Sequence, residues 1–128
     1  TVSRGYAHGG TVVPFHRNQT AIGYDTRTIS DTDAPKTFEE LLTYAQANPK
    51  KVAMTSPAQG GSGSGFLESA ILHFASSDCQ ERLYDATLTE DEANEWAAGE
   101  CLEPVMAYFQ ELAPNVEITN GNTDTLTL

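Results

Sequence analysis

The sequence predicts an α/β fold in which a sheet is layered with helices, and three observations lead to this expectation. Short apolar or β-branched runs alternate with segments whose apolar residues recur at helical spacing. The expected helices carry start or stop signals such as a capping threonine, a proline or a glycine. With 128 residues, 39% of them hydrophobic, the chain is long enough for one domain with a real core. We expect residues 1–10 to be a loop or disordered end and residues 11–128 to form a single α/β lobe.

In the first half of the chain, the sequence predicts three strands and one helix. Residues 11–15 read as a strand that Pro14 confines to an edge, and residues 20–24 read as a second strand. Thr37 and Glu40 have the spacing of a capping box, so a helix begins there and ends at Asn48-Pro49. Residues 52–54 are apolar enough for an interior strand.

A stretch rich in glycine and serine, residues 60–65, follows this interior strand and predicts a loop. A helix is predicted next, because apolar residues recur at the spacing of one helix face: Leu67, Ala70, Ile71 and Phe74. Four glycines in six residues cost backbone entropy, and one reason to carry them is the close approach of a ligand. The exposed N–H groups and positive dipole end of the helix favour a negative or hydrogen-bond-accepting group.

The second half of the chain is predicted to be mainly helical. One short helix falls within residues 76–88, and a capping box of Thr89 and Glu92 starts another that Gly99 ends. Pro104 sits in the first turn of a further helix. Its apolar face comprises Leu102, Val105, Met106, Phe109 and Leu112. Residues 116–118 return as a strand, and a short helix begins near Asn122.

Charge and hydropathy exclude several classes of function. Seven basic and eighteen acidic residues give a net charge of −11, which repels nucleic-acid backbones and anionic membrane surfaces. No apolar run approaches the roughly eighteen residues needed to cross a bilayer, so we expect no membrane insertion. No export signal is visible at the N-terminus. The missing initiator methionine and the interrupted last helix suggest a fragment of a longer protein.

The glycine- and serine-rich stretch matches none of the common catalytic loops. It lacks the lysine of a P-loop, it misses the dinucleotide pattern by one residue, and neither serine has the flanking glycines of a nucleophile elbow. The stretch stays a candidate ligand-binding site because of its free N–H groups and hydroxyls. Its candidate residues, Ser62, Gly63, Ser64 and Gly65 with Asn18, Gln19 and Thr20 beside them, offer N–H, hydroxyl and amide groups. The alternatives are a flexible loop with a serine cap and an ordinary turn at residues 18–20.

The remaining polar and aromatic residues indicate neither a metal site nor a cofactor. No pair of histidines has zinc-ligand spacing, and we expect His73 to be a partly buried, hydrogen-bonded residue on a helix. Trp96, Tyr108 and Phe109 fall at helical spacings and are expected in the core. Cys79 and Cys101 leave two interpretations open, a disulfide in an oxidising compartment or two small buried residues in a reducing one.

The order of several motifs resembles bacterial extracellular solute-binding proteins. Residues 13–25, VPFHRNQTAIGYD, are similar to the segment where that family crosses into its second lobe. Residues 35–42, PKTFEELL, resemble its proline–threonine helix start, and residues 45–49 its helix end. Residues 60–66 lie where the family has a glycine-rich loop and helix, and residues 122–126 resemble the approach to a return strand.

The resemblance implies one lobe of a two-lobe, type II periplasmic-binding-protein fold, without enzymatic activity. Such a protein captures a small solute in the cleft between its lobes and delivers it to the membrane permease of an ABC transporter. The implied location is the periplasm or the cell surface, and there the disulfide is the favoured interpretation of the two cysteines. The alternative is a small enzyme domain that grips a phosphate-containing substrate at the glycine- and serine-rich stretch. The sequence does not identify the solute.

Overall fold

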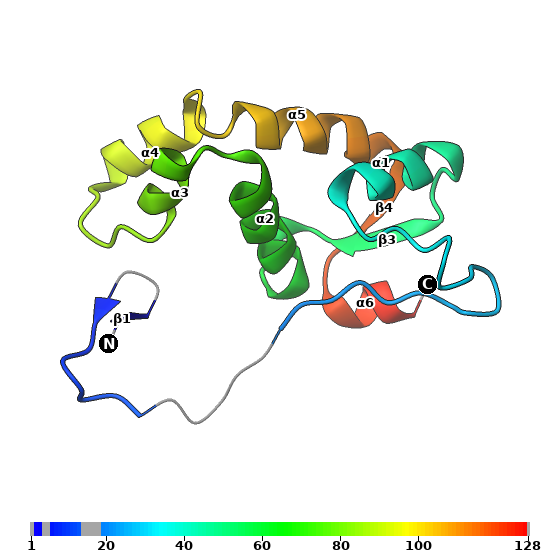
Figure 1. Cartoon of the computed structure of the whole chain (residues 1–128), viewed down its shortest axis with the longest axis horizontal. Helices are drawn as coiled ribbons and strands as arrows, with labels where there is room; N and C mark the ends of the chain where they lie inside the picture. Colours follow the sequence, from blue (N-terminus) through cyan, green and yellow to red (C-terminus); the bar gives the residue numbers. More distant parts are fainter. Residues whose placement is uncertain (1, 4–5, 14–18, 128) are drawn as a thin grey trace.

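The computed structural model describes residues 2–3, 6–13 and 19–127, and these form a mixed α/β structure dominated by helices (Figure 1). Its centre is a parallel pair of strands, β3 (Val52–Thr55) and β4 (Val116–Thr119). The register pairs Val52 with Val116 and Thr55 with Thr119, so both strands end at the same edge. The predicted α/β fold class is confirmed, with a small sheet.

A short hairpin lies in the segment that the sequence predicts as a loop. Strands β1 (Val2–Ser3) and β2 (Tyr6–Ala7) pair antiparallel within residues 1–10. The two strands predicted next are wrong where the structure describes them: residues 11–13 and 20–24 are irregular, and residues 14–15 lie outside the described part. Ile22 is 58% exposed and Tyr24 45% exposed. Strand propensity depends on packing against a neighbouring strand, and the described part of the chain places no strand beside residues 11–13 or 20–24.

Helix α1 (Phe38–Ala47) starts at the predicted threonine. The Thr37 hydroxyl accepts a hydrogen bond from the Glu40 N–H, while the Glu40 carboxylate accepts from the N–H of Lys36 rather than from Thr37 itself. Asn48 caps the other end, donating its backbone and side-chain N–H groups to the Tyr44 carbonyl. The capping signals therefore placed both ends of α1 correctly.

All the helices that connect the two parallel strands lie between residues 57 and 115. A 3-10 turn, η1 (Pro57–Gln59), leads into α2 (Gly61–Phe74), which is followed by α3 (Ser77–Leu83), α4 (Glu90–Ala98), α5 (Glu103–Leu112) and η2 (Ala113–Asn115). The capping box of Thr89 and Glu92 is present at the start of α4. A short last helix, α6 (Asn122–Leu126), follows β4.

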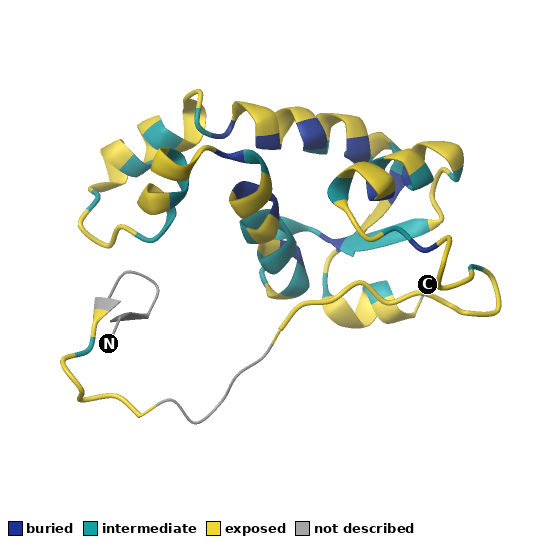
Figure 2. Cartoon of the chain, viewed as in Figure 1, coloured by how far each residue is buried: buried dark blue, intermediate teal, exposed yellow. Residues whose placement is uncertain are grey.

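The core consists of two apolar clusters on the inner side of α5 (Figure 2). The first joins α2 and α5 and comprises Ala70, Ile71, Ala75, Leu102 and Val105. The second joins α1, α5 and β4 and comprises Ala45, Tyr108, Leu112 and Val116. Burial, and the negative charge of Glu39, raise the pKa of Tyr108 to about 12. Its hydroxyl donates to the Phe38 carbonyl over 3.1 Å, which satisfies the buried group.

Three aromatic expectations hold, with Tyr108 buried in the second cluster, and one aliphatic expectation is wrong. Phe109 packs against both clusters and Trp96 against the first, as expected of core residues. Met106, predicted on the inner face of α5, is 49% exposed. Tyr108 is buried on that face together with the predicted Val105, because residues three apart on a helix share a side and Met106 is rotated away from both.

Candidate functional site

Three threonines meet at the edge where the parallel strands end. Thr55 ends β3 and is 2% exposed, and Thr119 ends β4 and is 8% exposed. The Thr125 hydroxyl from α6 lies 2.9 Å from the Thr55 hydroxyl and 2.5 Å from the Thr119 hydroxyl. We call Thr55, Thr119 and Thr125 the threonine cluster. The carboxyl ends of parallel strands are where α/β proteins bind ligands, so this end of the sheet is a candidate ligand-binding region.

Helix α2 begins beside the threonine cluster, and Asn122 covers its N-terminal end. The Asn122 Oδ1 atom accepts from the Ser62 backbone N–H at 3.2 Å, from the Ser62 hydroxyl at 2.6 Å and from the Thr55 hydroxyl at 3.2 Å. An amide oxygen of this chain therefore occupies the position that the sequence assigns to a ligand acceptor. In the structure, Ser62 serves to join α2 to α6.

The glycine- and serine-rich stretch is mainly helix rather than loop, which corrects the sequence-based expectation. Helix α2 already starts at Gly61, after Gly60 and Gly61 turn the chain with φ of +73° and +57°. Gly63 is buried, and a Cβ atom there would lie 2.4 Å from the Thr55 carbonyl oxygen. The helix thus packs directly on the end of β3, which gives Gly63 a structural reason that needs no ligand. Its role in ligand binding stays a prediction.

Thr20 lies beside Gly65, near the start of α2, and a joint ligand site of these two segments stays a prediction. A Cβ atom on Gly65 would be 2.6 Å from the Thr20 hydroxyl oxygen. Gln19 and Thr20 are exposed, as is Ser64, whose hydroxyl donates to the Gly61 carbonyl over 3.1 Å. The structure brings Thr20 and Gly65 together, while Asn18 lies outside the described residues.

An open pocket of about 310 Å³ adjoins this region between α2 and the end of α3. Its lining consists of Ser64, Leu67, Glu68, Ile71, Leu83 and Tyr84. The Tyr84 hydroxyl donates a hydrogen bond to the Glu68 carboxylate. Sequence reasoning missed Glu68 and Tyr84, although Glu68 stands one helical turn after Ser64 and therefore on the same face.

The comparison with known families decides what kind of protein carries this site. A family model described as bacterial extracellular solute-binding protein matches residues 4–128. The chain belongs to this family. No curated protein and no solved structure matches the chain significantly. Proteins of the family bind small molecules and are in general not enzymes, and membership supports a solute-binding role for this chain.

The chemistry of the candidate site suits binding by hydrogen bonds. Exposed Gln19 offers an amide, and exposed Thr20 and Ser64 offer hydroxyls, groups that both donate and accept. Among the residues that the structure describes, no group of three or more histidine, cysteine, aspartate or glutamate side chains has the arrangement to hold a metal ion. No described helix of this solute-binding protein is long and apolar enough to span a bilayer.

His73 lies away from the site, and its interactions are structural. Its Nε2 atom is 2.9 Å from a Glu39 carboxylate oxygen, and its ring stacks on Phe38 with centroids 4.9 Å apart. The hydrogen bond from His73 lowers the pKa of Glu39. The expected hydrogen bond is present, although the side chain is 42% exposed and so less buried than predicted.

Proposed function

We propose that this solute-binding protein captures a polar small molecule at the surface formed by Gln19, Thr20 and Ser64, and delivers it to the permease of an ABC transporter. The observation that carries the proposal is the contact of Thr20 with Gly65, because it sets the irregular segment against the first turn of α2. Exposed amide and hydroxyl groups from two distant parts of the sequence thereby share one surface. This is the arrangement that small-molecule sites use to orient a ligand.

The proposed mechanism is closure of two lobes around the solute, with these groups on the surface of one lobe that faces the other. Residues 11–128 supply one α/β lobe, and the cleft closes when the solute contacts both lobes at once. The solute stabilises the closed state only by its higher affinity for that state. The protein works outside the cytoplasm, in the periplasm or anchored at the cell surface, where an oxidised Cys79–Cys101 pair persists.

The enzyme alternative gains no support from the serines. The Ser62 hydroxyl donates to the Asn122 amide oxygen at 2.6 Å and lies 3.1 Å from the Thr55 hydroxyl, and the Ser64 hydroxyl donates to a backbone carbonyl. Among the described residues, neither hydroxyl is hydrogen-bonded to a histidine, lysine or carboxylate that activates a nucleophile.

The test is a thermal-shift screen of the full-length protein against sugars, amino acids, polyamines, vitamins and oxyanions. A solute at a hundred times its dissociation constant stabilises the protein by about 2.7 kcal/mol. We expect Ser64→Ala and Thr20→Ala to weaken binding of any hit. Ser69→Ala is the matched control, because Ser69 is also an exposed serine of α2 and its hydroxyl donates to the Gly65 carbonyl. Equal loss in all three variants, or silence across the panel with turnover of a phosphorylated substrate, contradicts the proposal.

A further inference from the structure

The acidic residues of this chain are distributed very unevenly. Residues 83–128 contain ten aspartates and glutamates and no lysine, arginine or histidine, so nearly the whole net charge of −11 resides there. Seven of the ten lie in α4, α5 and the turn between them, which run along the top of Figure 1 and which we call the acidic layer: Glu90, Asp91, Glu92, Glu95, Glu100, Glu103 and Glu111. A field of one sign over one layer attracts partners of the opposite sign and speeds their association.

A groove of about 540 Å³ runs along this acidic layer, between the end of α4 and the outer side of α5. Small and apolar residues, Ala97, Ala98 and Leu102, line it together with the carboxylates of Glu100 and Glu103. Met106 also lines the groove. Its side chain, which the sequence predicts in the core, is 49% exposed. Methionine is flexible and polarizable, and it recurs on protein surfaces that receive varied apolar side chains.

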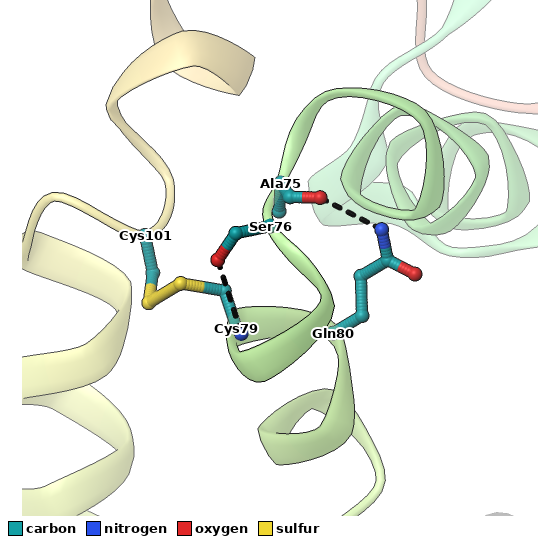
Figure 3. Close-up of a disulfide and its surroundings, with 5 residues drawn as sticks. All are labelled: Ala75, Ser76, Cys79, Gln80 and Cys101. Atoms are coloured by element: carbon teal, nitrogen blue, oxygen red, sulfur yellow. Dashed lines mark hydrogen bonds between the residues drawn. A yellow bond between two sulfur atoms is a disulfide. The ribbon is translucent and has the colours of Figure 1, made fainter.

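A disulfide fixes the turn between α4 and α5, which borders this groove (Figure 3). Cys101 lies in the turn between α4 and α5 and is bonded to Cys79 of α3, with Cα atoms 5.4 Å apart. The next residue, Leu102, is buried in the first core cluster. The disulfide and the burial of Leu102 restrict the turn that borders the groove, and a restricted surface loses less conformational entropy when a partner binds.

We propose that the groove lined by Ala97, Glu100, Leu102 and Met106 binds a basic segment of another protein, with one apolar side chain of that segment seated on Met106. Charge complementarity identifies this occupant. A second copy of the chain, with the same acidic layer, is repelled, and so is an anionic membrane. Because apolar side chains also line the groove, the basic segment needs one apolar side chain among its basic residues. The proposal is independent of solute binding, because neither Thr20 nor Ser64 lines the groove.

The experiment measures binding of a fluorescein-labelled helical peptide by the full-length protein, using fluorescence anisotropy at low ionic strength. The peptide carries leucine at i, i+3, i+4 and i+7 and lysine elsewhere, and a second peptide has serine in place of each leucine. We expect the leucine peptide to bind and Glu100→Lys to weaken it by about tenfold. Met106→Ser is expected to weaken the leucine peptide while leaving the serine peptide unaffected.

Glu117→Lys is the matched control, because Glu117 is exposed on β4 and outside the groove, and the variant makes the same change in charge. Circular dichroism establishes that each variant is folded. If Glu100→Lys and Glu117→Lys weaken peptide binding equally, the proposal is overturned, because the overall negative charge of the protein rather than the groove then attracts the peptide. Absence of binding, or equal binding of the two peptides, overturns it as well. Displacement of the peptide by low spermidine concentrations assigns the groove to a small cation, and dimerisation in sedimentation assigns it to a second copy.

Discussion

Replacing Gly63 with alanine tests whether the glycine is required by packing of α2 on the end of β3. The new Cβ atom would lie 2.4 Å from the Thr55 carbonyl oxygen and 2.6 Å from that of Ser56. Ordinary contacts of this kind begin near 3.4 Å, so the helix has to move away by about 1 Å. Both neighbours are backbone atoms, which places the overpacking cost at about 3 kcal/mol. Alanine returns about 1 kcal/mol of helix propensity, leaving a net destabilisation of about 2 kcal/mol.

Gly65→Ala is the matched control on the same helix. Its Cβ atom would meet the Thr20 hydroxyl at 2.6 Å, and Thr20 belongs to an exposed, irregular segment that can yield. The gain in helix propensity then offsets most of the cost, so the free energy of unfolding changes by less than about 0.5 kcal/mol.

Urea unfolding followed by circular dichroism measures both variants. The expected loss for Gly63→Ala corresponds to a melting temperature lower by about 8 °C for a chain of this length. If Gly63→Ala unfolds within about 0.5 kcal/mol of the wild type, the packing explanation is refuted. If Gly65→Ala costs as much as Gly63→Ala, the destabilisation comes from helix α2 in general rather than from its contact with β3.

Three further outcomes are expected. Reduction of the Cys79–Cys101 disulfide lowers the free energy of unfolding by about 3 kcal/mol, measured by urea unfolding with and without reductant; an unchanged midpoint would show that the disulfide adds no stability. Asn122→Ala removes the acceptor at the start of α2 and costs about 1 to 2 kcal/mol, whereas Asn122→Asp keeps an acceptor and costs less at pH 7, which thermal melts distinguish. The backbone and side-chain hydrogen bonds from Thr89 hold the pKa of Glu92 below 4.5, so its stabilisation is complete above pH 4.5 and disappears as the pH falls through the lowered pKa. The stability difference between the wild type and Glu92→Gln should therefore shrink in acid, and a pH-independent difference contradicts this assignment.

The sequence by itself determined the features that depend on neighbouring residues. Thr37 and Thr89 start helices because a side-chain oxygen can satisfy a free N–H three residues on, whatever the rest of the fold does. Strands β3 and β4 follow from short apolar runs bounded by proline or asparagine, although β3 is a half-buried strand of a two-stranded sheet rather than an interior one. The solute-binding family also followed from the order of short motifs along the chain.

Tertiary structure alone decided the details of the candidate site. The glycines at residues 60–65 indicate close approach to backbone, but only the fold shows that the end of β3 approaches Gly63. Asn122 reaches α2 across 60 residues of sequence, so no local pattern announces that it caps this helix. The strand propensity of residues 20–24 is overridden because a strand needs a partner beside it. Helix capping and hydrophobic periodicity depend on residues close together in sequence, whereas packing partners depend on contacts between residues far apart in the chain.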